Sequence, residues 1–462
     1  MSELLAAFAA ATARHPDRVA LVGPDGKAVT YAALQGRIEA LAGVWSTLRP
    51  GARVLIALPL GADLYAALAA LWSRGATAVL PEPATGLAGL RAALRSVPVD
   101  AMLTAGPYRL LRLLPALWSV PRLPLSGGDP APNHLPALDD LALISFTSGS
   151  TGAPKAIPRS HAFLAAQRRA IAPLLAGERE TDLVAFPVFA LLNLAEGRTS
   201  VLPDWPLSKM QRATSRGLNR LVARHGVTRA LLPPALCEVL ADGPWPGGLH
   251  TVFTGGGPVF PDLVARMAEH ARVVSVYGST EAEPIAHFEA SAASVADRAA
   301  MAEGAGLLAG VPAPGARVRI EEGEILVAGD HVVGGYLDPA RDAETKLRDG
   351  DTIWHRTGDA GRLDADGRLW LLGRHGAAVQ TDRGPLHPFA IETAARLWPG
   401  VTRAALAPGP ILAVEGDATR LPLWRDQAAP FGVTDIRPVG HLPMDRRHRS
   451  KIDQRRLEEM LR

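Results

Sequence analysis

Cysteine and lysine are both scarce in this 462-residue chain, and both scarcities limit the kinds of functional site that the chain can form. Cys237 is the single cysteine, so the chain can form no internal disulfide and no cysteine-built metal site, and we expect a small buried apolar residue there. Only five of the 49 basic residues are lysine, at positions 27, 155, 209, 346 and 451. Because arginine is a poor substitute where a compact ammonium must touch one oxygen, the remaining lysines are candidates for specific roles.

Long apolar runs and concentrated charge are also missing. The most apolar stretch, 64–80, contains Arg74, so no run of 18 uncharged apolar residues is present and no transmembrane segment is expected. Residues 1–18 lack a basic start followed by an apolar run, which predicts an amphipathic helix rather than a signal peptide. The net charge is +3, with no basic run interleaved with aromatic residues, so a nucleic-acid partner is not expected. A cytoplasmic protein is the prediction.

Hydrophobic residues make up 48% of the chain, enough for the two or three domains that this length suggests. Apolar runs alternate with helical patterns, which is typical of parallel α/β units. The runs lie at 52–60, 76–83, 227–234, 249–257 and 271–279. The last two end in glycine-rich turns, where parallel sheets usually bind ligands.

After about residue 312 the pattern changes to short strands and turns. The sequence Asp-Ala-Asp-Gly at 364–367 predicts a hairpin turn. Residues 374–462 mix short strands with helices and end in a basic helix.

The segment 144–155 carries the strongest chemical signal. An apolar strand runs into Thr147-Ser-Gly-Ser-Thr-Gly152 and ends with Pro154-Lys155. Glycines let backbone amides converge on anionic oxygens, hydroxyls add donors, and the lysine adds a charge. The spacing differs from the Walker A pattern. A flexible linker is the alternative, but a linker needs neither the strand before it nor the Pro-Lys after it.

Three further motifs are weaker when taken singly. In Tyr277-Gly-Ser-Thr-Glu281 an aromatic ring can stack on a purine and a carboxylate can hold Mg²⁺, although a simple turn would also explain it. In Arg356-Thr-Gly-Asp359, with Arg374 further on, a carboxylate can accept both ribose hydroxyls, although Asp359 could equally be a cap. The basic run 446–451 is either a solvated face or a place for Lys451 to act.

Together, in this order and spacing, the four segments resemble the adenylate-forming superfamily of acyl-CoA synthetases, adenylation domains and luciferases, over about residues 5–455. The resemblance implies an α/β fold. It comprises a large N-terminal domain (1–373), with parallel sheets flanked by helices and a small distorted β-barrel, and a small mobile α+β lid (374–462).

The resemblance also implies the nucleotide site, with ATP and Mg²⁺ as the groups it binds. The β- and γ-phosphates would contact Thr147, Ser148, Gly149, Ser150, Thr151, Gly152 and Lys155. The adenine would lie against Gly255, Gly256, Gly257 and Tyr277, and the ribose against Asp359 and Arg374. The catalytic residues would be Thr280 at the α-phosphate, Glu281 as the Mg²⁺ ligand, and Lys451, which bridges the α-phosphate and the attacking carboxylate.

A narrower resemblance concerns the substrate. Residues 186–204, 368–392 and 445–452 look like the β-lactone synthetases of bacterial olefin biosynthesis, which adenylate a β-hydroxy fatty acid and close the ring without CoA. Gly376 stands where many relatives carry Asp or Lys as hinge. The acyl pocket is expected to use Phe186, Phe189, Leu191, Leu192, Glu283 and Ile285, with core packing as the alternative for the aromatics.

Three functions therefore remain open. The first is activation of a β-hydroxy acid followed by lactone formation. The second is an acyl-CoA or acyl-carrier-protein ligase, in which CoA or a carrier protein, or another pathway enzyme, is a partner. The third is a nucleotide-binding relative without catalysis. His161, His355 and His448 are expected to be structural hydrogen-bonders rather than catalytic groups.

Overall fold

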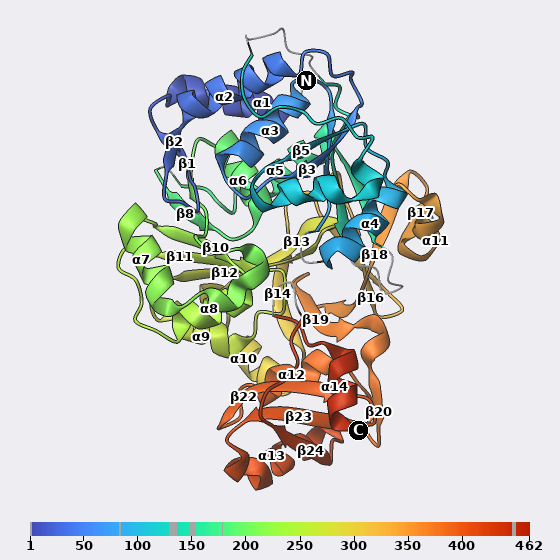
Figure 1. Ribbon diagram of the computed structural model, residues 1–462. Helices are drawn as coiled ribbons and strands as arrows, with labels where there is room; N and C mark the ends of the chain where they lie inside the picture. Colours follow the sequence, from blue (N-terminus) through green and yellow to red (C-terminus); the bar gives the residue numbers. More distant parts are fainter. Residues whose placement is uncertain (1, 83–84, 129–135, 148–153, 178, 446–449) are drawn as a thin grey trace. The chain divides into compact units, whose positions relative to one another are not determined.

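The computed structural model describes residues 2–462 except 83–84, 129–135, 148–153, 178 and 446–449 (Figure 1). The chain forms two compact units, which are described separately. Unit 1 comprises Met1–Lys209, Leu221–Leu231 and Asp330–Lys346. Unit 2 comprises Met210–Arg220, Leu232–Gly329 and Leu347–Arg462.

One sheet of unit 1 carries the motif around residue 147. Its strands, in spatial order, are β5 (Ala101–Thr104), β3 (Arg53–Ala57), β4 (Thr77–Leu80), β6 (Leu141–Thr147) and β7 (Lys155–Ser160). The first four are parallel and β7 is antiparallel to β6. The apolar runs predicted from the sequence form β3 and β4, and the helical pattern between them forms α3 (Ala62–Trp72), as the parallel α/β prediction requires. Helices α2 (Tyr31–Val44) and α4 (Gly86–Ser96) precede β3 and follow β4 in the chain.

A second sheet of unit 1 contains β10 (Arg229–Leu232), β8 (Thr181–Val184), β9 (Thr199–Val201), β1 (Val19–Val22) and β2 (Ala28–Thr30), in that spatial order. All neighbours are parallel except β1 and β2. The same unit holds α1 (Glu3–Arg14), α5 (His161–Ile171), α6 (Pro187–Ala195) and α11 (Asp342–Thr345). The predicted N-terminal helix is α1, which Ser2 caps by accepting a hydrogen bond from the Leu5 amide.

The main sheet of unit 2 begins with the parallel pair β11 (Thr251–Gly255) and β12 (Arg272–Ser279). It continues through antiparallel strands β13 (Ala282–Glu289), β14 (Leu307–Pro312), β19 (Leu369–Arg374), β18 (Thr352–Leu363), β16 (Glu324–Ala328) and β15 (Arg317–Glu321). The hairpin predicted at 364–367 joins β18 to β19, and its Gly367 has a φ of 73°. Helices α8 (Pro234–Ala241), α9 (Pro261–Ala268) and α10 (Val295–Ala302) belong to this unit. Helix α7 (Ser215–His225) and strand β17 (Lys346–Asp349) include residues of both units.

The prediction of a small β-barrel is wrong, because in the part of the chain that the structure describes these strands form an open sheet. Strand β15 is the end strand of this order and pairs with β16 alone, while β14 pairs with β19 through 307–310 and with β13 through 311–312, so β15 and β14 do not join to close a barrel. The α/β character is confirmed, with helices and parallel-containing sheets in both units.

Residues 374–462 have a core of their own within unit 2. A three-stranded sheet, β22 (Val401–Ala407), β23 (Ile411–Gly416) and β24 (Asp435–Val439), packs with the helices around Trp424, Ile391 and Leu412, all fully buried. The other elements of this region are β20 (Val379–Thr381), β21 (Gly384–Leu386), α12 (Pro388–Ala395), α13 (Leu421–Ala428) and the predicted basic terminal helix, α14 (Gln454–Leu461). Among the helices built from described residues, none has the length and apolarity needed to cross a membrane.

Candidate functional site

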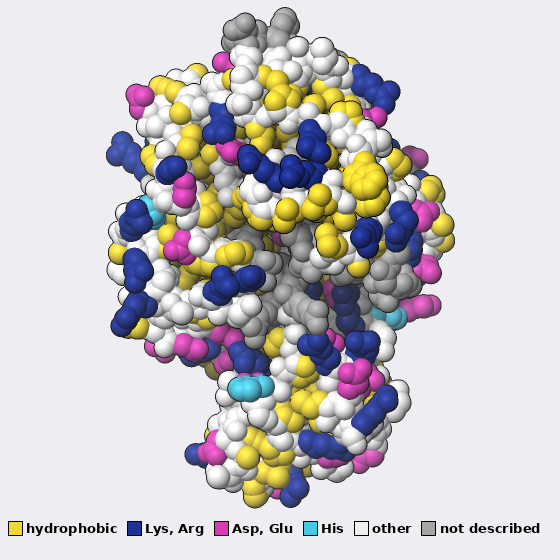
Figure 2. Space-filling model, in the orientation of Figure 1, with side chains coloured by type: hydrophobic (Ala, Val, Ile, Leu, Met, Phe, Trp, Pro, Cys, Tyr) yellow, Lys and Arg dark blue, Asp and Glu magenta, His cyan; other side chains and the backbone are white. Residues whose placement is uncertain are grey.

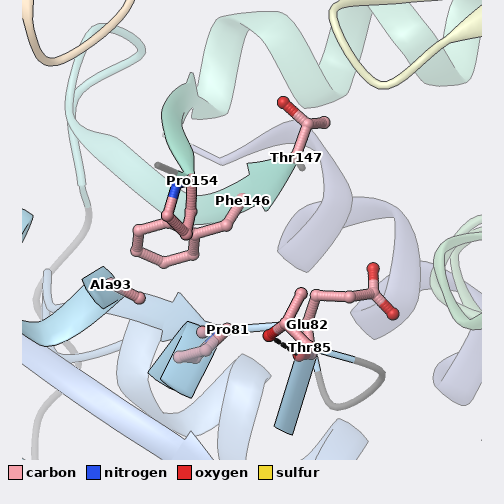
Figure 3. Close-up of a pocket in the computed structure, with 8 residues that line it drawn as sticks. Pro81, Glu82, Thr85, Ala93, Phe146, Thr147 and Pro154 are labelled. Carbon is pink, nitrogen blue, oxygen red and sulfur yellow. Dashed lines mark hydrogen bonds between the residues drawn. The ribbon is translucent and has the colours of Figure 1, made fainter. Parts of the chain in front are cut away.

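The two ends of the predicted phosphate loop lie next to each other in unit 1. Thr147 ends β6, Lys155 begins β7, and the two residues are direct antiparallel partners. Ser148, Gly149, Ser150, Thr151 and Gly152 lie outside the described residues. A small pocket at the ends of β4 and β6 lies beside this point, with Pro81, Ala93 and Phe146 among its lining residues, and includes Thr147 and Pro154 (Figure 3). The loop therefore starts at the carboxyl edge of a parallel sheet, where such sheets bind ligands.

Lys155 is held against an aromatic ring from a distant part of the chain. Its Nζ lies 5.2 Å from the centre of the Tyr336 ring, and the Nζ of Lys346 lies 5.5 Å from the same centre. The Leu337 amide donates a 3.2 Å hydrogen bond to the Ala156 carbonyl, and the Tyr336 amide donates to Asp342. Two of the five lysines thus share one ring at the end of the phosphate loop, where cation–π attraction orients the ammonium groups.

The predicted ribose contacts form a connected cluster in unit 2. The Tyr277 hydroxyl donates a 2.8 Å hydrogen bond to Asp359, and Arg374 lies 3.2 Å from the other carboxylate oxygen. Asp359 and Arg374 face each other across β18 and β19. Removal from solvent raises the pKa of Tyr277 well above its ordinary value, and the adjacent Asp359 carboxylate raises it further, so the phenol stays protonated and remains a donor.

A buried glutamate fixes the backbone that carries Asp359. Glu324 is buried and accepts hydrogen bonds from the Arg356 guanidinium (2.8 Å) and from the Gly358 amide (2.9 Å). The Glu324 contact raises the pKa of Arg356. Thr357 adds a 2.8 Å hydrogen bond to the Ile325 carbonyl. Glu324 was not predicted from the sequence, because a single glutamate at the start of a strand carries no distinctive signal.

The glycine turn after β11 meets the segment that carries Lys451. A Cβ placed on Gly257 would lie 2.5 Å from the Cβ of Ser450, so only glycine permits this approach. The Ser450 hydroxyl accepts a 3.3 Å hydrogen bond from the Ala235 amide, and Asp445 accepts from the amides of both Ser450 and Lys451 at 2.9 Å. Residues 255–257 and 450–451, distant in sequence, are therefore brought together within unit 2, with the Lys451 side chain exposed.

Thr280 and Glu281 form the turn between β12 and β13, because Ser279 and Ala282 are the last paired residues of that hairpin. The motif 277–281 therefore includes the end of β12 rather than following the strand. Among the described residues, no group of three or more His, Cys, Asp or Glu side chains could hold a metal ion. Mg²⁺ usually takes one or two carboxylates and completes its shell with phosphate and water oxygens, so a lone Glu281 is compatible with it.

The predicted acyl-pocket residues divide between the two units. In unit 1, Phe186 precedes α6, and its ring centre lies 5.9 Å from that of Phe189; Phe189 and Leu192 are buried and Leu191 is half-buried. In unit 2, Glu283 and Ile285 lie on β13, and Ile285 is fully buried.

The remaining candidates from the sequence are buried where they are described. His161 packs edge-on against Trp72, and burial lowers its pKa to about 4. His355 lies buried on β18, and Cys237 lies buried in α8. His448 is outside the described residues. The buried Nε2 of His161 has no hydrogen-bond partner among the described residues, so the structural hydrogen-bonding role expected for these histidines stays a prediction.

Comparison with known proteins identifies the family. The AMP-binding enzyme family matches residues 8–337. The olefin beta-lactone synthetase of Xanthomonas campestris is 32% identical over 87% of this chain and 84% of its own length. The feruloyl-CoA synthase of an Amycolatopsis species is 30% identical over 89% of this chain and 87% of its own length.

Solved structures share the fold across nearly the whole chain. The amide bond synthetase McbA of Marinactinospora thermotolerans superposes with a TM-score of 0.82 at 23% identity, covering 99% of this chain and 100% of that one. The o-succinylbenzoate CoA synthetase of Bacillus subtilis in complex with ATP and magnesium ion has a TM-score of 0.78 at 20% identity, covering 98% and 99%. This chain belongs to the AMP-binding enzyme family and is an AMP-forming, acid-activating ligase whose sequence is similar to the olefin beta-lactone synthetases.

Proposed function

We propose that this ligase binds ATP with Mg²⁺ and activates a carboxylic acid, a β-hydroxy fatty acid, as an acyl-adenylate, which then closes to a β-lactone. The observation that carries the nucleotide part is the Tyr277–Asp359–Arg374 cluster. Its carboxylate is held by a phenol and a guanidinium, and it lies on a backbone fixed by Glu324. A carboxylate positioned in this way suits the paired hydroxyls of a ribose.

In the first step, a carboxylate oxygen of the acid attacks the α-phosphorus, and the bond from that phosphorus to the pyrophosphate oxygen breaks. An anion must approach a polyanion, so the barrier is largely electrostatic. Lys155 and the hydroxyls and amides of 147–152 would hold the β- and γ-phosphates. Thr280 would contact the α-phosphate, and Lys451 would neutralise charge between it and the attacking carboxylate. Mg²⁺ on Glu281 would supply further positive charge to the phosphates.

The adenine is assigned to Gly255–Gly257 and the ring of Tyr277, and the ribose to Asp359 and Arg374. We assign residues 374–462 as a lid that moves relative to 1–373. The contact between Ser450 and Gly257 supports its role in adenylation, since it brings the backbone of Lys451 to the glycine turn.

In the second step, the β-hydroxyl oxygen attacks the acyl carbon, the bond from that carbon to AMP breaks, and the hydroxyl proton is released. The nucleophile is tethered to the electrophile, so proximity is supplied by the substrate itself. Support comes from the two olefin beta-lactone synthetases that align over 87% and 69% of this chain. Phe186, Phe189, Leu191, Leu192, Glu283 and Ile285 are assigned to the acyl group.

A second candidate is transfer of the acyl group to a thiol, either of CoA or of a carrier protein. The similarity to a feruloyl-CoA synthase favours CoA, and the similarity to a Salinispora arenicola nonribosomal peptide synthetase, of which the alignment covers 4%, favours a carrier protein.

Mass spectrometry of the products separates these candidates. The purified protein is incubated with ATP, Mg²⁺ and 3-hydroxy acids of increasing length, with and without CoA. We expect AMP, pyrophosphate and a lactone that is about 18 Da lighter than the acid, because ring closure removes one water molecule from each acid. Thioester formed only when CoA is present would refute the lactone assignment. Absence of AMP with every acid and thiol would refute the whole proposal.

A further inference from the structure

The segment after β5 displays apolar and basic side chains together on the surface of unit 1. It forms two short 3-10 helices, η2 (Gly106–Leu113) and η3 (Pro115–Leu117). A 3-10 helix has three residues per turn, so side chains three apart lie in one row. Arg109 and Arg112 form one row, and Leu110 and Leu113 form the next.

The third row anchors the segment. Leu111 and Leu114 pack into a cluster with Leu55 and Met102, and this cluster also takes up Leu90 and Leu94 from α4. The inward face of η2 is therefore satisfied by the core of unit 1, and α4 lies beside it. This packing does not explain the exposed apolar side chains of the same segment.

Four large apolar side chains stand out from this surface instead of packing into it. They are Leu87 on α4 (55% exposed), Leu110 (66%), Leu113 (64%) and Trp118 (71%). A side chain exposed to this extent projects from the surface and lines no groove. Isolated exposed apolar residues are ordinary, but these four lie on α4 and on the η2–η3 segment, which share one buried cluster, and several such residues on neighbouring elements mark an interaction surface.

The charge around these side chains has one sign. Residues 86–122 contain five arginines and one aspartate, a net charge of +4, whereas the whole chain carries only +3. The single aspartate, Asp100, is paired with Arg49 at 2.6 Å. Figure 2 shows hydrophobic and basic side chains intermixed on the upper part of the face in view, where α4 lies in Figure 1. Basic and protruding apolar side chains therefore occur together in residues 86–122. The more basic stretch 205–229, with six basic residues and no acidic one, has none of the exposed large apolar side chains among its described residues.

We propose that this surface, formed by Leu87, Arg109, Leu110, Arg112, Leu113 and Trp118, docks the enzyme onto an anionic lipid bilayer. Leucine and tryptophan side chains that project from a short amphipathic helix enter the boundary between headgroups and acyl chains, and tryptophan is favoured at that depth. Arginines in the adjacent row meet the lipid phosphates, while their methylene groups stay with the apolar side chains.

The row of Arg109 and Arg112 beside the apolar side chains favours an anionic bilayer, whose phosphates and acyl chains match the two kinds of side chain at one depth. The proposed fatty acid substrate would also be delivered from a bilayer, and this supporting reason alone rests on the proposed function. Docking itself needs neither ATP nor acid, so vesicle binding and product formation can fail independently.

Vesicle co-sedimentation of the full chain tests the proposal. We use vesicles of phosphatidylcholine alone and vesicles in which about one third of the lipid is phosphatidylglycerol. The wild type should sediment with the anionic vesicles and much less with the neutral ones. The double variant Leu110→Ser/Leu113→Ser should lower partitioning at least about tenfold on anionic vesicles. Arg109→Gln/Arg112→Gln should lower it at least about tenfold on the same vesicles, because each arginine near an anionic surface contributes about a fivefold factor.

A matched control separates a local effect from net charge. Arg216 and Arg220 are also exposed and lie four residues apart on α7. The double variant Arg216→Gln/Arg220→Gln changes net charge by the same amount and should partition like the wild type. Pyrophosphate release with a water-soluble acid should be unchanged in all variants, which establishes that they are folded.

Three results would overturn the proposal. One is a wild type that stays in solution with anionic vesicles. Another is equal loss of partitioning in the α7 control and in the η2 variants. The third is a wild type that does not bind vesicles but binds a second copy of itself or an acidic protein through Leu110 and Leu113. The surface would then be a protein interface.

Discussion

Replacing Tyr277 with phenylalanine tests whether the cluster around Asp359 positions the nucleotide. The change removes one oxygen atom and keeps the aromatic ring, so any stacking on adenine is retained. What is lost is the 2.8 Å hydrogen bond from the phenol to the Asp359 carboxylate. The backbone of 357–359 keeps its bonds to Glu324 and Ile325, so Asp359 stays in place but loses one of the two groups that orient it.

The magnitude follows from the kind of bond removed. A hydrogen bond to a charged group contributes about 1.5–3 kcal/mol, and about 1.4 kcal/mol corresponds to a factor of ten. Arg374 remains 3.2 Å from Asp359, but its side chain is largely exposed, so water weakens its hold. We therefore expect kcat/KM for ATP to fall about 10- to 100-fold, with most of the loss in KM.

The assay is ATP–pyrophosphate exchange at varied ATP, together with direct binding of AMP, which carries the same ribose. Both should weaken by a similar factor. Tyr31→Phe is the matched control, because that buried phenol donates to the Arg198 carbonyl at 2.9 Å in unit 1. A Tyr277→Phe enzyme whose kcat/KM for ATP lies within about threefold of wild type would refute the reasoning, since a bond to a charged carboxylate should contribute more.

Three further predictions concern other parts of the site and the fold. Lys451→Ala should lower ATP–pyrophosphate exchange by about 10²–10³ while the melting temperature stays close to wild type, because the side chain is exposed. Tyr336→Leu should raise KM for ATP about fivefold, by removing the ring that orients Lys155, and should leave AMP binding unchanged, as calorimetry would measure. Burial raises the pKa of Glu392 from 4.5 to about 7, so the folded state holds its proton more tightly than the unfolded state does. The free energy of unfolding of Glu392→Gln should therefore equal that of wild type below about pH 4. The difference in favour of the variant should grow with pH and reach about 3 kcal/mol above pH 7, as measured by chemical denaturation.

Each of these has a control and a refuting result. Lys27 is an exposed lysine next to Asp25, and its replacement by alanine should leave exchange unaltered. Weaker AMP binding in Tyr336→Leu would mean a general disturbance rather than loss of phosphate contacts. A pH-independent difference between Glu392→Gln and wild type would show that the buried carboxyl does not titrate in the expected range.

The parallel elements could be predicted from the sequence because their signal is local. Apolar runs of the right length, bounded by glycine and proline, became β3, β4, β10, β11 and β12. The open sheet could not be predicted in the same way. Whether β15 closes on another strand depends on which edges of β14 are already occupied, and that is a property of pairing partners distant in sequence.

The same distinction holds for the candidate site. Tyr277, Asp359 and Arg374 each belong to a recognisable motif, and the structure brings the three together. Glu324 and Tyr336 were missed because their importance comes from the group they touch. A glutamate at the start of a strand or a tyrosine in a loop has no distinctive pattern until Gly358 or Lys155 is found beside it. The phosphate contacts of residues 148–152 stay a prediction, because these residues lie outside the part of the chain that the structure describes.

The close approach of Gly257 to Ser450 leaves no space for a side chain at position 257. A single methyl group added at 257 would push away Ser450 and, with it, the backbone of Lys451. Because Gly257 is also assigned to the adenine, such a variant tests the nucleotide contact and the placement of residue 451 together. Replacing Ser450 with glycine as well would remove the clash, so the double variant Gly257→Ala/Ser450→Gly should restore what Gly257→Ala alone loses.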